Sequence, residues 1–130
     1  MQFTSLVALT LSLTASASAL ATCHQSGVWA QRTDGLSKLS QACNRLDGSY
    51  GAGNLKSICI NGANNIRWNF EVQKANAGNG VVDHSTCVAR LSNIISDCGG
   101  QNADTCGGTA TYNIAGHSYK FSVDPNTGAC

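Results

Sequence analysis

Charge is scarce in this chain and nearly balanced in sign. Its 130 residues include eight lysines and arginines and seven aspartates and glutamates, for a formal net charge of +1 at pH 7. Proteins that bind nucleic acid by neutralising phosphates carry their basic residues in a cluster or stripe, and no basic run occurs here. We therefore expect no nucleic acid partner.

Recognisable metal and catalytic motifs are also missing. The sequence has no Cys-x-x-Cys pair, and its three histidines lack the spacing of zinc ligands. It has no His-Glu-x-x-His motif, no nucleophile elbow and no phosphate-binding glycine loop. Glu71 is the sole glutamate and the aspartates are scattered, so nothing selects the carboxylate pair of a glycosidase or the oxygen cluster of a calcium site. We expect no enzyme activity, no metal and no cofactor.

The first 21 residues contain no charged side chain. An apolar run too short to span a bilayer is followed by the small residues Ala15-Ser-Ala-Ser-Ala19, which is the layout of a secretory signal peptide. No second apolar segment of this kind follows, so we expect no membrane insertion. The prediction is a signal peptide at 1–21 and a secreted single domain at 22–130. Cleavage after Ala17, Ala19 or Ala21 fits equally well.

Seven cysteines all follow this segment, and aromatic residues make up only 6% of the chain. A domain this small buries a modest core, so cross-links matter for its stability, and export places the chain where disulfides persist. Seven cysteines allow three bridges and leave one thiol, which is either buried and free or linked to a second chain. The pairing stays open, although we expect Cys130 to anchor the end of the C-terminal strand. The cysteines are Cys23, Cys43, Cys59, Cys87, Cys98, Cys106 and Cys130.

Apolar residues at helical spacing predict two helices, over residues 36–46 and 86–98. Thr33 or Asp34 is the expected N-cap of the first helix. Ser85 is the expected N-cap of the second helix, which ends at Gly99-Gly100. Because each apolar face includes cysteine, we expect both helices to be stapled to what they cover. These faces consist of Leu36, Leu39, Cys43 and Leu46, and of Cys87, Leu91, Ile94, Ile95 and Cys98.

Alternating apolar and polar residues predict a strand over residues 65–72, with Trp68 and Phe70 on its buried side. A strand over residues 57–60 precedes it. The connection Asn61-Gly62-Ala63-Asn64 contains an Asn-Gly pair, which favours a hairpin turn.

A second hairpin is expected between residues 109–114 and 118–124, with Gly116 in the turn. A short strand is expected at residues 28–30. About five strands and at least two helices predict an α+β domain with a mainly antiparallel sheet. The Gly/Asn/Ala-rich stretches expected to be loops are 48–54 and 74–80.

The polar side of the 65–72 strand carries Arg67, Asn69 and Glu71. Such a row can be an ordinary solvated strand face. It can also serve a small secreted ribonuclease, in which a carboxylate takes a proton and a histidine such as His117 protonates the leaving oxygen. The same residue types can bind a carbohydrate, because planar side chains satisfy sugar hydroxyls in fixed geometry.

A carbohydrate site also uses an exposed aromatic ring, which packs on the apolar face of a sugar. Trp29 is our first candidate because it lies next to the polar run Gln31-Arg32-Thr33-Asp34, although it can equally be a core residue beside Val28. Tyr50, in a glycine-rich stretch, is the second candidate. We expect the ligand site to include Trp29, Arg67, Asn69 and Glu71, with Tyr50 and His117 behind them.

The signal peptide, the Cys87–Cys98 helix and the C-terminal segment Tyr119–Cys130 resemble small secreted cysteine-rich fungal proteins, in particular mushroom lectins that recognise fucosylated LacdiNAc. The resemblance runs over the whole mature chain. It implies a single-domain α/β sandwich that pairs into a homodimer through sheet edges and binds fucose- or GalNAc-containing glycans on glycoproteins or cell surfaces. The wider group includes effectors and killer-toxin-like proteins, so a secreted effector or toxin remains an alternative, beside the ribonuclease.

Overall fold

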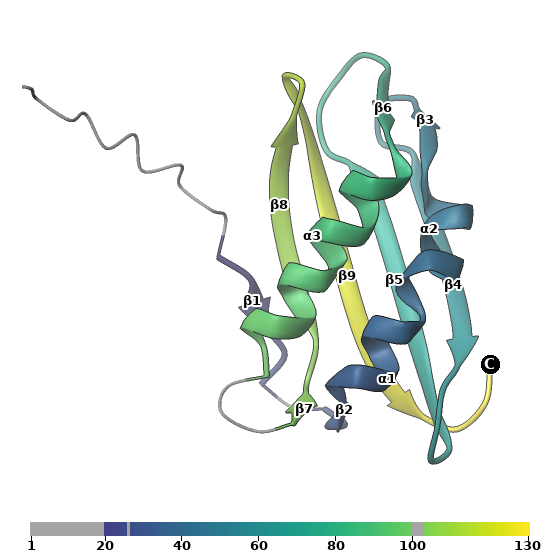
Figure 1. Ribbon diagram of the computed structural model, residues 1–130. Coiled ribbons are helices and arrows are strands. Elements are labelled where there is room, and N and C mark those ends of the chain that lie inside the picture. The colour runs from purple at the N-terminus through teal and green to yellow at the C-terminus, as the bar shows by residue number, and fades with distance from the viewer. Residues whose placement is uncertain (1–19, 26, 100–102) are drawn as a thin grey trace, which may run out of the picture.

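The computed structural model describes residues 20–25, 27–99 and 103–130. The predicted signal peptide lies outside this part of the chain except for residues 20–21. The described residues form a two-layer α/β sandwich, in which a five-stranded antiparallel sheet carries three helices on one face (Figure 1). The expected α+β class, with a mainly antiparallel sheet of five strands, is confirmed.

The strand order of the main sheet is β1-β8-β9-β5-β4. Two small sheets, β2 with β7 and β3 with β6, lie at its ends (Figure 1). The elements are β1 (Thr22–Cys23), β2 (Ala30–Gln31), α1 (Arg32–Ser37), α2 (Leu39–Leu46), β3 (Gly48–Tyr50), β4 (Leu55–Asn61), β5 (Ile66–Lys74), β6 (Gly80–Val82), α3 (His84–Asp97), β7 (Asp104–Thr105), β8 (Gly108–Ile114) and β9 (His117–Thr127).

Both predicted hairpins are confirmed, as β4–β5 and β8–β9. The β8–β9 turn consists of Ala115 and Gly116, with φ of 51° and 82°. Positive φ at both positions is the pattern of a type I′ turn, whose twist matches the strands. In the β4–β5 connection, the residues with positive φ are Asn64 (57°) and Asn65 (56°), which lie beyond the predicted Asn-Gly pair.

The first predicted helix is in fact two, because α1 and α2 meet at Lys38. Neither Thr33 nor Asp34 caps it: α1 begins at Arg32, and Asp34 lies within its first turn. The Asp34 carboxylate is instead engaged by donors of the β4–β5 hairpin. These contacts between distant parts of the chain replace the local cap.

The second predicted helix, α3, is capped by Asp83 and not by Ser85. The Asp83 carboxylate accepts the backbone N–H of Thr86 at 2.7 Å, which is the usual N-cap geometry. The Ser85 hydroxyl donates to the same carboxylate at 3.0 Å. The stretches expected to be loops also hold structure, since β3 begins at Gly48 and pairs with β6.

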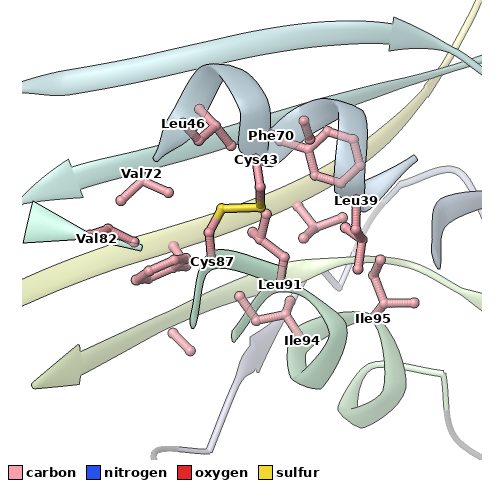
Figure 2. Packing of buried hydrophobic residues seen from close by; sticks show 14 of the residues in the cluster. Leu39, Cys43, Leu46, Phe70, Val72, Val82, Cys87, Leu91, Ile94 and Ile95 are labelled. Atoms are coloured by element: carbon pink, nitrogen blue, oxygen red, sulfur yellow. A yellow bond between two sulfur atoms is a disulfide. The ribbon is translucent and has the colours of Figure 1, made fainter. Parts of the chain in front are cut away.

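The core lies between the helices and one face of the sheet. Trp68, Phe70 and Val72 of β5 are fully buried, as the alternation predicts. Figure 2 shows the Cys43–Cys87 disulfide joining α2 to α3 among buried aliphatic side chains. Each fully buried aliphatic side chain contributes about 1.5–3 kcal/mol, so these two helices are held mainly by apolar packing. The surrounding residues include Leu39, Leu46, Val82, Leu91, Ile94 and Ile95.

Three disulfides and one free thiol account for the seven cysteines, as expected. Beside Cys43–Cys87, the bridges are Cys23–Cys98 and Cys59–Cys130. The free thiol is the buried Cys106, which corresponds to the first of the two alternatives considered above. Cys130 fixes the C-terminal segment beyond β9 to β4.

Candidate functional site

A cavity of about 270 Å³ opens where the β4–β5 connection meets β2, α1 and β7, and we call it the Trp29 cavity. These elements gather at one end of the sandwich (Figure 1). The lining combines an indole, two carboxylates, two primary amides and three aliphatic side chains. The residues are Trp29, Ala30, Gln31, Asp34, Ala63, Asn64, Ile66 and Asp104.

Trp29 supplies the aromatic surface of the cavity. Trp29 is 54% exposed, whereas Trp68, the other tryptophan, is fully buried. Large aromatic side chains are usually buried, so an exposed indole at the mouth of a cavity is informative. The residue that we singled out for stacking on a ligand therefore has the required exposure.

Asp34 is held in a fixed orientation at the cavity. Its Oδ2 accepts the indole N–H of Trp68 at 2.8 Å and the backbone N–H of Ala63 at 3.0 Å. Trp68 is itself tightly enclosed: a Cβ at Gly35 would lie 2.7 Å from its ring. The second oxygen, Oδ1, lies 3.6 Å from Nζ of Lys38. This leaves Oδ1 as the oxygen able to accept a hydrogen bond from a ligand.

Asp104 and Gln31 come from two strands of two residues each and are directly opposite one another in the β2–β7 ladder. Asp104 is half-buried, and within the described part of the chain its carboxylate makes no hydrogen bond or ion pair. Together with the Asn64 amide, these groups offer hydrogen-bond donors and acceptors around the indole.

The predicted polar row lies elsewhere. Arg67, Asn69 and Glu71 share the sheet face that no described helix covers, and we call it the uncovered sheet face. The Arg67 guanidinium donates to the carbonyls of Thr127 at 3.1 Å and Ala129 at 3.4 Å. Arg67 thus holds the C-terminal segment against β5, and this structural role explains the arginine at this position without a ligand.

Glu71 is exposed in the middle of this face, opposite Ser57 and Ser122. It borders a depression of about 70 Å³ that also includes Lys120. Hydroxyl and amide side chains surround it. In the part of the chain that the structure describes, the uncovered sheet face is therefore mainly polar and carries no aromatic side chain.

Tyr50 does not lie at an accessible surface, contrary to its selection as an exposed aromatic candidate. Only 1% of it is exposed, because β3 pairs with β6 and packs against the core. Its hydroxyl donates to the Leu46 carbonyl, and its ring meets that of Tyr119 edge-on at 5.6 Å. Burial, with additional contributions from Tyr119 and Asp47, raises the pKa of the Tyr50 hydroxyl well above its ordinary range.

His117 begins β9 opposite Ile114, so its side chain belongs to the helix-covered side of the sheet. Glu71 lies on the other side. The remaining histidines have acidic neighbours of their own: His84 lies 3.2 Å from Asp47, and His24 lies 3.9 Å from Asp124. The ribonuclease hypothesis favours a histidine close to Glu71. Within the described residues, no hydrogen bond or ion pair joins a histidine to Glu71.

The predicted site residues thus separate into the Trp29 cavity, the uncovered sheet face, the core around Tyr50 and the start of β9. Sequence reasoning missed Asp34, Asn64 and Asp104 as cavity residues. Asp34 could have been noticed, because it closes the polar stretch that follows Trp29. Asp104 and Asn64 reach the cavity only through long-range pairing, which leaves no local signal.

Searches against protein families, curated proteins and solved structures find no match for this chain. Among the described residues, no group of three His, Cys, Asp or Glu side chains is arranged to hold a metal ion. In the same part of the chain, no helix has the length and apolar character needed to cross a membrane. The structure therefore defines the class of protein by its architecture, a disulfide-stapled α+β sandwich with a polar, aromatic cavity.

Proposed function

We propose that this protein is a secreted lectin that binds glycans at the Trp29 cavity and does not transform them. The observation that carries the proposal is the exposed Trp29 indole beside the fixed carboxylate of Asp34. A sugar presents an apolar ring face to an aromatic side chain and directs its hydroxyls toward charged and amide groups. The cavity has both kinds of surface within one lining.

The ligand class that we propose is a fucose- or GalNAc-containing glycan of the LacdiNAc type, carried on glycoproteins or cell surfaces. This class comes from the resemblance of the signal peptide, the α3 segment and the C-terminal segment to mushroom lectins. The lining is compatible with it, because Gln31 and Asn64 can both donate and accept hydrogen bonds. Binding is expected to need no metal.

Secretion is part of the proposal. Three disulfides in a domain of this size are typical of chains that fold in an oxidising compartment. The charge-free N-terminal segment supplies the predicted export signal.

We also propose a homodimer formed through the exposed edge of β4. This strand has seven residues, ends the sheet and contains no proline. Leu55 at its start is 50% exposed. A charged side chain on an edge strand can prevent pairing with another strand. Lys56 is the only charged residue in β4, and its ammonium group donates a hydrogen bond to the Asp47 carbonyl at 2.9 Å. Its charge is therefore engaged within the chain. An edge strand of this length without a free charged side chain favours pairing with a strand of another molecule. A dimer formed in this way would present two sugar sites at once.

A glycan array with the purified mature protein, followed by titration of the best ligands, tests the lectin function. Trp29→Ala should abolish binding because it removes the stacking surface. Glu71→Ala is the matched control and should bind like the wild type, since Glu71 lies on the uncovered sheet face. EDTA should leave binding unchanged.

Three outcomes would contradict this proposal. Loss of binding in Glu71→Ala but not in Trp29→Ala would move the site to the uncovered sheet face. Hydrolysis of RNA with a bell-shaped pH profile would make the protein a ribonuclease. A tight protein partner that persists in the presence of competing sugars would make it an effector or toxin.

A further inference from the structure

We infer that the Trp29 cavity selects neutral glycans and discriminates against the same glycans when the bound sugar carries a carboxylate or a sulfate group. This inference rests on the proposed glycan binding and names a finer ligand class for the same site. It agrees with the proposed class, because fucose, N-acetylgalactosamine and LacdiNAc are uncharged. It follows from the charge of the lining, from the hydrogen-bonding capacity of its carboxylates and from the contrast with the other concave surfaces of the molecule.

The charged residues of the lining are all acidic. The cavity is lined by two carboxylates, from Asp34 and Asp104, and by no lysine, arginine or histidine. The other hydrogen-bonding side chains that line it beside the indole are the neutral amides of Gln31 and Asn64. The whole chain has a formal net charge of +1, so the negative charge of the cavity is a local property. Charges of one sign in a concave site repel a ligand of the same sign and have little effect on a neutral one.

The carboxylates also restrict which groups a ligand can present to them. An ionised carboxylate accepts hydrogen bonds and donates none. Asp34 Oδ2 already accepts the indole N–H of Trp68 at 2.8 Å and the backbone N–H of Ala63 at 3.0 Å, which fixes the position of Oδ1. A sugar hydroxyl can donate to this oxygen, whereas a sulfate or carboxylate group would place an acceptor against an acceptor. Charge and hydrogen-bonding capacity therefore discriminate in the same direction.

One lysine offsets part of this charge. Lys38 Nζ lies 3.6 Å from Asp34 Oδ1, so the two residues form an ion pair at the side of the cavity. Asp104 forms no ion pair within the part of the chain that the structure describes. The lining thus keeps a net negative charge when Lys38 is counted with it.

The other concave surfaces differ in charge. The depression beside Glu71 also contains Lys120, so its charges are of opposite sign. The cavity between β3 and β6 is lined by uncharged residues. A further depression is lined by Arg45, Leu55, Lys56 and Ser57, and its charged residues are both basic. Rejection of an acidic glycan is therefore a property that we expect of the Trp29 cavity and not of every concave surface.

The test is a titration of the whole mature protein with three forms of LacdiNAc. At C6 of the terminal N-acetylgalactosamine they carry the natural hydroxymethyl group, a primary carboxamide or a carboxylate. The carboxamide and the carboxylate have nearly the same shape and differ in charge. We expect the wild type to bind the carboxamide form about tenfold more tightly than the carboxylate form at low salt, and the difference to shrink as salt is added. Calorimetry measures the three affinities.

Matched variants should move the ratio of these affinities in opposite directions. Asp104→Asn preserves the shape of the side chain and removes one negative charge from the lining, so it should lower the ratio. Lys38→Gln removes the cation beside Asp34 and should raise it. Glu71→Gln removes a negative charge from the uncovered sheet face and should leave the ratio unchanged. Near-ultraviolet circular dichroism checks that each variant folds.

Failures of the two proposals are distinguishable. Binding that persists in Trp29→Ala arises outside the cavity and is subtracted from each titration. Equal affinities for the carboxamide and carboxylate forms in the wild type, or a ratio that does not change in Asp104→Asn, overturn the present inference and leave the lectin intact. If the wild type binds none of the three forms, the proposed ligand class fails together with this inference. If it also binds no glycan on the array, the lectin proposal itself fails.

Discussion

Asp34 links the core to the candidate site through a single side chain. One of its oxygens accepts the buried indole N–H of Trp68, which would otherwise lose a hydrogen-bond partner on burial. The same carboxylate lines the Trp29 cavity. Any change that moves Trp68 should therefore also move a carboxylate that lines the Trp29 cavity.

Gly35→Ala tests this coupling. The added Cβ would lie 2.7 Å from the Trp68 ring, so we expect overpacking to lower the free energy of unfolding by about 1–3 kcal/mol and to weaken glycan binding. Urea unfolding followed by fluorescence measures the first effect, and titration with a glycan measures the second. Gly51→Ala, where the nearest atom would lie 3.7 Å from the new Cβ, is the control and should change neither. A Gly35→Ala variant as stable as the wild type would show that the Trp68 contact is not tight.

The sequence predicts the burial of Trp68 but not its partner. Strict alternation along β5 decides which side of the strand each residue occupies, and that is a local property. The hydrogen bond from Trp68 to Asp34 joins residues 34 positions apart, and no periodicity encodes it. Tyr50 shows the converse error, because a glycine-rich neighbourhood suggested exposure while pairing of β3 with β6 buries it.

At the scale of elements, the start of α3 depends on one exposed carboxylate. The backbone N–H of Thr86, followed by the hydroxyls of Thr86 and Ser85, lowers the pKa of Asp83 below its ordinary value. A carboxyl group with a lowered pKa in the folded state stabilises that state above the unfolded pKa of about 4. This stabilisation is lost as the pH falls through the folded pKa.

Asp83→Ala should therefore lower the urea midpoint at pH 7, and the difference from the wild type should shrink as the pH falls below about 4. Asp83→Asn caps the helix without a charge and should retain most of the stability, with a weaker dependence on pH. Urea unfolding at several pH values, followed by circular dichroism, measures both. A wild-type and Asp83→Ala difference that stays constant down to pH 2 would contradict the role of the ionised carboxylate.

Long elements could be predicted from the sequence and short ones could not. The β4–β5 and β8–β9 hairpins and α3 have enough residues to display a period. Strands β1, β2 and β7 have two residues each, so they display none. Because β2 and β7 form one wall of the Trp29 cavity, the site was less predictable than the fold around it.

At the scale of the whole molecule, the free thiol reports on the integrity of the fold. Cys106 is 5% exposed, and its Sγ lies 3.3 Å from the carbonyl oxygen of Cys98. We expect the native protein to be inert to a thiol reagent and the denatured, unreduced protein to react at one thiol per chain. Intact mass spectrometry after alkylation measures this, with Cys106→Ala as the unreactive control. Rapid labelling of the native protein, or more than one reactive thiol, would contradict the described pairing.

The order of the bridges along the chain has a consequence for proteolysis. Each bridge joins a cysteine at or before Cys59 to a cysteine at or after Cys87, so all three span the stretch between them. The exposed connection at 75–79 lies within this stretch. A cut there would leave two fragments joined by three covalent links and by the β5–β9 ladder. Nicking in this exposed loop would thus break the continuity of the chain but leave the two parts of the fold held together.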